Sequence, residues 1–124
     1  TPPVLYGDGS QAYDFIYVSD CAKANICAMK ANTTDRFYNV GTGIRTSIRE
    51  LAEKIIEITN SKLSIHYETS GITFVKNRIG CPKKAEAEID FKSTISLDEG
   101  LSKLIEWRSN HMEQVELKRK KVAV

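Results

Sequence analysis

The chain has 124 residues and a net charge of +2, with 41% hydrophobic and 27% charged residues, which suits one globular domain or a large piece of one. No apolar run approaches the roughly 18 residues of a membrane-spanning helix, so we expect no membrane segment. The cysteines Cys21, Cys27 and Cys81 lack metal-type and disulfide-type spacing, which argues against a zinc cluster or a disulfide framework and indicates a reducing, cytoplasmic location.

The first third of the chain predicts a strand, a helix and a second strand. Asp14 to Val18 is a short run of bulky residues typical of a strand, and Ser19 or Asp20 is placed to cap a helix that ends near residue 30. Residues 36–40 form the second predicted strand. One face of the helix carries a stripe of small residues that allows close packing: Cys21, Ala24, Cys27, Ala28 and Ala31.

The middle of the chain predicts a helix and a third strand. Ser47 and Glu50 have the spacing of a capping box, and the helix that follows has the clearest amphipathic pattern of the sequence. Its apolar positions are Ile48, Leu51, Ala52, Ile55 and Ile56. Leu63 to Tyr67 alternates like a strand, and residues 68–80 have the polar composition of a loop.

The last third predicts two helices and a charged end. Pro82 suits the first position of a short helix that runs to Ile89, and Ser96 to Glu99 is a second capping box. The final helix reaches at least Arg108. The basic run within residues 109–124 indicates a solvated, frayed tail rather than a nucleic-acid site. The order β-α-β-α-β-α-α predicts an α/β fold.

The turn Gly41-Thr42-Gly43 imitates a dinucleotide-binding site. A predicted strand precedes it, a capped helix follows, and Glu68 ends the next strand. Thr46, however, stands where the third glycine of that fingerprint allows the helix to pack against the strand. We therefore expect a plain strand-to-helix turn, with NAD binding at this turn as the alternative.

The run from Gly7 to Asp20, the Tyr-Asn-Val-Gly sequence at 38–41 and the segment 78–85 resemble one known family in this order. They are similar to the substrate-binding half of the extended short-chain dehydrogenases, the NAD-dependent epimerase/dehydratase enzymes typified by UDP-glucose 4-epimerase. The resemblance implies that residues 1–108 are the C-terminal, substrate-binding portion of a Rossmann-type enzyme whose N-terminal part is absent. Residues 109–124 are then a charged tail.

The resemblance also implies a nucleotide site. Tyr13 stands where the family has a phosphate-binding arginine, and Arg78 matches a second arginine that binds the diphosphate. Cys81 stands where an aspartate or a serine is expected near the ribose. The residues implied at the substrate are Leu5, Tyr6, Tyr13, Phe15, Arg78 and Cys81. Tyr13 and Phe15 have ordinary packing within a strand as their alternative reading.

The family's catalytic Tyr-x-x-x-Lys pair has no match here, because none of the five tyrosines has a lysine four positions on. The resemblance therefore implies a nucleotide-sugar-binding part of an NAD-dependent epimerase, inactive alone and binding no NAD alone. For the intact enzyme the resemblance implies that NAD oxidises a sugar hydroxyl. We also expect a homo-oligomer that binds neither membrane nor nucleic acid. A sister dehydratase, decarboxylase or reductase is one alternative. A non-catalytic α/β module that binds a nucleotide or a protein is the other.

Overall fold

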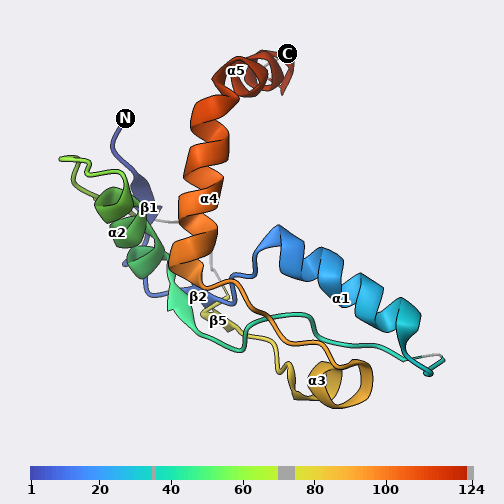
Figure 1. Ribbon diagram of the computed structural model, residues 1–124. Helices are drawn as coiled ribbons and strands as arrows, with labels where there is room; N and C mark the ends of the chain where they lie inside the picture. Colours follow the sequence, from blue (N-terminus) through green and yellow to red (C-terminus); the bar gives the residue numbers. More distant parts are fainter. Residues whose placement is uncertain (35, 70–74, 123–124) are drawn as a thin grey trace.

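The structure, a computed structural model, describes residues 1–34, 36–69 and 75–122. It has the predicted α/β class, with short strands and longer helices (Figure 1). In chain order its elements are β1 (Val4–Tyr6), β2 (Ala12–Tyr13), α1 (Val18–Lys30), β3 (Thr46–Ser47), α2 (Ile48–Ile58), β4 (His66–Glu68), β5 (Asn77–Arg78), α3 (Lys83–Ile89), α4 (Leu97–Asn110) and α5 (Met112–Val122).

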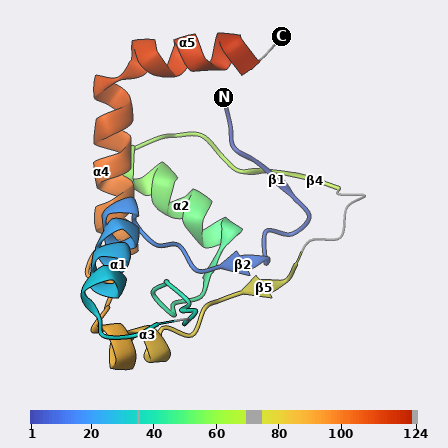
Figure 2. The same cartoon turned by 90° about the vertical axis from the view of Figure 1, so that its right-hand side faces the viewer.

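The strands form two small sheets. In the first, β1 pairs in parallel with β4, so that Leu5 lies opposite Tyr67. In the second, β2 is central, antiparallel to β3 and parallel to β5. Figure 2 shows β1 beside β4 and β2 beside β5. The segment 7–11 connects β1 of the first sheet to β2 of the second, so these two strands are close together in the sequence.

The main core lies between α1 and α3. Its fully buried centre is Phe91, and the small side chains of Ala24 and Ala85 let the two helices approach each other closely. The Cys27 thiol donates to the carbonyl of Asp90, which lies 63 positions further along the chain. The small-residue stripe of α1 therefore faces the core at Ala24, Cys27 and Ala31, whereas Ala28 is exposed.

The apolar face of α2 borders two hollows. One, of about 320 Å³, lies between α2, α4 and the segment that follows β2. The other, of about 330 Å³, lies between α2 and the N-terminal residues around β1. Of the five predicted apolar positions, only Ala52 is buried, and Ile55 keeps 38% of its surface exposed. The amphipathic pattern is thus confirmed, and its apolar face is only partly covered.

The strand predictions were wrong in detail. Residues 36–40 form no strand, because a strand needs a hydrogen-bonded neighbour and the described part of the chain supplies none there; Phe37 is 88% exposed. The strand expected at 14–18 is absent: β2 lies just before it, at Ala12–Tyr13, and Val18 already begins α1. The strand expected at 63–67 starts later, as β4.

The helix ends were predicted with mixed success. The Ser47–Glu50 capping box is present in full. At Ser96 only half of the second box forms, because Glu99 pairs with Lys103 instead. The N-cap of α1 is Tyr17, not Ser19 or Asp20. Pro82 is the N-cap of α3 rather than its first residue.

The end of the chain is helical where a frayed tail was expected. Helix α5 follows α4 after a break at His111 and turns sharply away from it (Figure 1). Next to the break, the rings of Trp107 and His111 stack with their centroids 4.7 Å apart. The division of the chain at residue 108 stays a prediction.

None of the helices that the structure describes is long and apolar enough to span a lipid bilayer. Nor does the described part of the chain bring three histidine, cysteine or acidic side chains together as a metal site would require.

Candidate functional site

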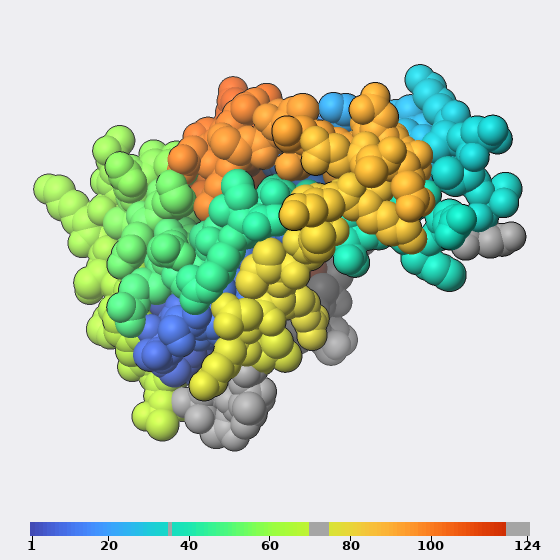
Figure 3. Space-filling view, turned by 90° about the horizontal axis from the view of Figure 1, so that it is seen from below, coloured from blue at the N-terminus to red at the C-terminus, as the bar shows by residue number. Residues whose placement is uncertain are grey.

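The pairing of β2 with β5 brings Tyr13 and Arg78 side by side. They occupy matching positions in the parallel register, and the backbone N–H of Asp14 donates to the carbonyl of Arg78 at 3.1 Å. Residues in matching register point to the same face of a sheet. Phe15 joins this row, since its ring meets the Tyr13 ring edge to face, 6.2 Å between centroids. Arg78 is exposed, and Figure 3 shows its yellow segment crossing one face of the molecule.

Asp14 holds the glycine turn that follows residue 40. Its carboxylate accepts hydrogen bonds from the backbone N–H groups of Thr42 (2.9 Å) and Gly43 (2.8 Å) and from the Thr42 hydroxyl. A side chain at Gly41 would collide with this carboxylate, so the close approach of the turn requires glycine there. The glycines that imitate a dinucleotide fingerprint thus serve a contact with Asp14.

The N-terminus of α2 does not fit a pyrophosphate. Its first N–H groups are already bonded: Ile48 and Arg49 donate to carbonyls of the loop 9–11, and Glu50 donates to the Ser47 hydroxyl. The Glu50 carboxylate in turn accepts from the N–H of Ser47 at 2.6 Å, which lowers the pKa of Glu50. With the turn N–H groups held by Asp14, NAD does not fit at this turn.

Leu5 and Tyr6 lie on the other sheet. The Leu5 side chain is 7% exposed and packs into the protein, whereas Tyr6 is half exposed at the end of β1. Gly7, which follows, continues the pairing by donating its N–H to the carbonyl of Glu68 at 2.8 Å. One edge of the β1 backbone is therefore engaged by β4.

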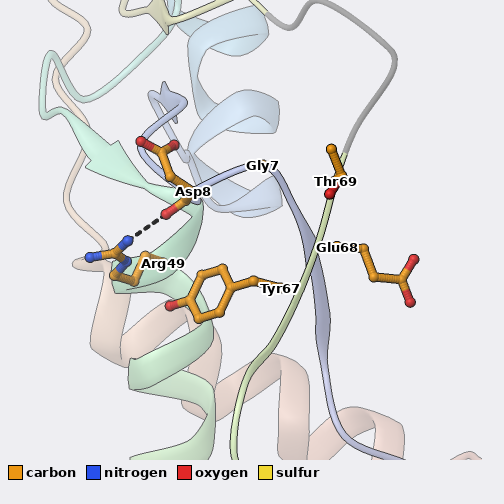
Figure 4. A pocket seen from close by; sticks show the side chains of 6 residues that line it. All are labelled: Gly7, Asp8, Arg49, Tyr67, Glu68 and Thr69. Atoms are coloured by element: carbon orange, nitrogen blue, oxygen red, sulfur yellow. Dashed lines mark hydrogen bonds between the residues drawn. The ribbon is translucent and has the colours of Figure 1, made fainter.

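The ends of β1 and β4 border an open pocket of about 730 Å³. Figure 4 shows the Arg49 side chain from α2 reaching toward this pocket, with Tyr67 beside it and Glu68 pointing away. The Arg49 guanidinium lies 5.5 Å from the centre of the Tyr67 ring and donates to the carbonyl of Asp8. The pKa of the Asp8 carboxyl is lowered by hydrogen bonds from Ser10. This pocket can offer a cation and a phenol to a polar ligand.

Arg49 and Tyr67 were not among the residues implied by the sequence. No motif marks them, since they meet only because β1 pairs with a strand some sixty positions later. The single available signal was the alternation that placed Tyr67 at the end of a predicted strand.

Cys81 is exposed on the way from β5 to α3, beyond Arg78. Of the neighbouring lysines, Lys84 is committed elsewhere: its ammonium donates to the carbonyl of Phe37 and lies 5.1 Å from the centre of the Tyr38 ring. Lys83 is exposed. Of the six implied residues, the structure therefore brings Tyr13, Phe15 and Arg78 together. Leu5 and Tyr6 lie on the other sheet, and Cys81 lies in the connection between β5 and α3.

Comparisons with known proteins identify the family that the chain resembles. Residues 1–41 match the model of the NAD dependent epimerase/dehydratase family. A putative UDP-glucose 4-epimerase of Methanocaldococcus jannaschii is 35% identical over 109 residues, covering 88% of this chain and 35% of that protein. A UDP-N-acetyl-alpha-D-glucosaminuronate decarboxylase of Bacillus cytotoxicus is 31% identical, with 84% and 34% covered.

Among solved structures, the Bordetella bronchiseptica enzyme WbmF in complex with NAD+ and UDP superimposes with a TM-score of 0.81 at 32% identity, covering 96% of this chain and 35% of that one. The chain thus spans about a third of the length of the proteins it matches.

Proposed function

The chain belongs to the NAD-dependent epimerase/dehydratase family of extended short-chain dehydrogenases, and we propose that it forms the nucleotide-diphosphate-binding part of a sugar-nucleotide epimerase. In this proposal the substrate's diphosphate lies over the row formed by Tyr13, Phe15 and Arg78. The base lies toward the open end of β1, near Tyr6, and Cys81 borders the ribose.

The observation that carries the proposal is the register of β2 with β5. It fixes the backbone of Arg78 against Asp14 and sets Arg78, which is exposed, at the position opposite Tyr13. A guanidinium forms paired, charge-assisted hydrogen bonds with phosphate oxygens, whereas a phenol adds one neutral donor. Arg78 is therefore the principal diphosphate ligand of the proposal, and Tyr13 is secondary.

By the full-length enzyme we mean the longest natural protein that contains this sequence. We propose that its catalytic residues and its NAD site lie outside these 124 residues. The 124 residues hold no Tyr-x-x-x-Lys pair, and the glycine turn does not fit NAD. The relative WbmF carries NAD+ together with UDP, which supports NAD as the cofactor of the full-length enzyme. We also propose a cytoplasmic location, in keeping with three free thiols, and a homo-oligomer.

A sugar-nucleotide decarboxylase is the second candidate, because one of the relatives, 31% identical, is a decarboxylase. The same diphosphate site serves both reactions, so the activity of the full-length enzyme distinguishes them. With NAD+ present, an epimerase converts UDP-glucose into its C4 epimer, which NMR detects. A decarboxylase instead releases CO2 from a UDP-hexuronic acid. Turnover by the 124-residue chain alone would contradict the proposal that catalysis requires the rest of the full-length enzyme.

The site itself is tested by the affinity of the full-length enzyme for UDP, measured by calorimetry at fixed salt. Arg78→Ala removes a charge-assisted pair, and we expect UDP binding to weaken by about ten- to a hundredfold, or roughly 1.5–3 kcal/mol. Lys83→Ala is the matched control, an exposed charge whose loss costs under about 1 kcal/mol. Binding of UDP to Arg78→Ala with wild-type affinity would show that the site is assigned wrongly.

A further inference from the structure

We propose that Asp14 is a positioning residue for Arg78, holding the segment 78–82 in place at both of its ends. The inference rests on the proposed function, because it concerns the same diphosphate site. Asp14 itself makes no contact with the ligand in this proposal. It acts by fixing the loop from which the Arg78 guanidinium extends.

The first end is held through the backbone. The N–H of Asp14 donates to the carbonyl of Arg78 at 3.1 Å, and the preceding residue, Tyr13, is paired with Arg78 in the parallel register. β5 has only two residues, so this bond is a large part of what ties it to the sheet. A shift of the Asp14 backbone would therefore shift the backbone at Arg78 as well.

The other end is held through the side chain and the glycine turn. The Asp14 carboxylate takes three hydrogen bonds from Thr42 and Gly43. Gly43 in turn packs directly against the end of the segment: a Cβ added there would lie 3.1 Å from Cδ of Pro82 and 3.9 Å from the carbonyl oxygen of Gly80. Residues 80–82 therefore pack against the turn that Asp14 holds.

The middle of the segment also meets the carboxylate. A Cβ added at Gly80 would lie 3.7 Å from an oxygen of Asp14. Asp14 therefore holds one end of the segment 78–82 directly and the other end through the glycine turn. The only arginine of this segment is Arg78. A loop held at both ends presents a side chain with less freedom to lose on binding, which raises its effective affinity for a ligand.

Asp20 offers a matched control, because the hydrogen bonds to its carboxylate repeat those of Asp14. Its carboxylate also accepts two backbone N–H groups and a threonine hydroxyl, from Thr94 and Ile95. The same change from aspartate to asparagine at both positions keeps the shape, leaves one carboxyl oxygen and turns the other acceptor into a donor. The two variants lose comparable hydrogen bonds, but only Asp14 adjoins the Arg78 segment.

The experiment is a double-mutant cycle in the full-length enzyme, with UDP as the probe and calorimetry at fixed salt. We expect Asp14→Asn to weaken UDP binding by about three- to tenfold and Arg78→Ala by about ten- to a hundredfold. The double variant should bind no more weakly than Arg78→Ala alone, because Asp14 acts through Arg78. Asp20→Asn should lower the melting temperature and leave UDP affinity within about twofold of wild type.

Three results overturn the inference. Additive losses in the double variant would show that Asp14 acts independently of Arg78. Wild-type affinity in Asp14→Asn, with Arg78→Ala weakened, would reject the positioning role and leave the proposed site standing. Wild-type affinity in Arg78→Ala would reject the site and the inference together. If Asp14→Asn does not fold, Thr42→Val removes one of the three bonds and Thr42→Ser restores it, and the same cycle is read from that pair.

Discussion

Two hydrogen bonds join Asp20 and Thr94, which lie 74 positions apart in the chain. The backbone N–H of Thr94 donates to one carboxylate oxygen at 2.9 Å and its hydroxyl donates to the other at 3.0 Å, while Ile95 adds a third bond. Asp20 is only 2% exposed. A buried carboxylate is tolerated where donors replace its water, so Asp20 ties the first turn of α1 to the segment that leads into α4.

Replacing Asp20 by alanine is expected to destabilise the chain by about 1–3 kcal/mol, because two partly buried backbone N–H groups lose their acceptor. Urea unfolding, followed by circular dichroism, measures the change. Glu86→Ala is the control, since the pair of Glu86 with Lys92 is exposed and its loss costs under about 1 kcal/mol. Equal losses of stability in the two variants would contradict a stabilising role for the hydrogen bonds of Asp20 with Thr94 and Ile95.

Acid is expected to weaken the fold through Asp20. Burial raises the pKa of its carboxyl, but the N–H groups of Ile95 and Thr94 outweigh burial and bring the pKa below its ordinary 3.8. A pKa that is lowered in the folded state stabilises the protein fully above the ordinary value, and this stability is lost as the pH falls through the folded pKa. The free energy of unfolding should therefore fall as the pH is lowered below about 4.

The check is urea unfolding at a series of pH values between about 6 and about 2.5 for wild type and Asp20→Asn. The variant should start less stable and lose less on acidification. Glu50, whose pKa is lowered by Ser47, contributes equally to both proteins and cancels in the difference. If the free energy of unfolding falls equally with pH in wild type and Asp20→Asn, the acid sensitivity comes from groups other than Asp20.

The two serine caps are expected to differ in strength. Ser47 is part of a complete capping box with Glu50, whereas Ser96 only accepts from the N–H of Glu99 at 3.2 Å. Ser47→Ala should cost about 1–2 kcal/mol and Ser96→Ala about 0.5–1 kcal/mol. Thermal unfolding of both variants under one buffer condition gives the order, and the reverse order would show that the reciprocal bond of Glu50 adds nothing.

A methyl group at Gly41 is expected to destabilise the chain, because it would collide with the Asp14 carboxylate. Gly41→Ala should cost about 1–3 kcal/mol, the range for overpacking a filled site. At Gly80 a Cβ would meet its neighbours at 3.7 Å, which is ordinary contact, so Gly80→Ala should change the stability by under about 1 kcal/mol. Calorimetric melting of both variants compares them directly.

The 124-residue chain is expected to self-associate. One face of α1 leaves Val18, Ile26 and Met29 exposed, Met29 at 85%, and Phe37 nearby in sequence is 88% exposed. Exposed apolar faces of this kind favour association. Sedimentation velocity should show a mass that rises with concentration, and Met29→Lys together with Phe37→Lys should reduce it. A monomer across the whole concentration range would count against this.

The helices were the predictable part of this fold, since their signals are local. The capping box at Ser47 and the apolar positions that follow it lie within a dozen residues, and α2 begins where they indicate. Strands need a hydrogen-bonded partner, so residue types alone predicted strands at 36–40 and 14–18 that do not form and missed β2 at Ala12–Tyr13. Asp20 was misread for the same reason: a cap is a local role, whereas its actual donors lie 74 positions away.

The candidate site was predictable only as separate residues. Family resemblance indicated Tyr13 and Arg78, but their adjacency depends on a parallel pairing across the whole middle of the chain. Arg49 and Tyr67 depend on a second such pairing and carry no motif. Spacing along the sequence does not show which strands meet, because the paired residues lie far apart in the chain.

The bond between Cys27 and Asp90 has a consequence for biosynthesis, because 63 residues separate its partners. A ribosome adds about 5–20 residues per second, so α1 is complete for roughly 3–12 s before the residues that cover its inner face are made. During that interval Ala24 and Cys27 remain in contact with water. Translation speed across residues 30–90 therefore sets how long this nascent surface stays open to chaperones and to premature association.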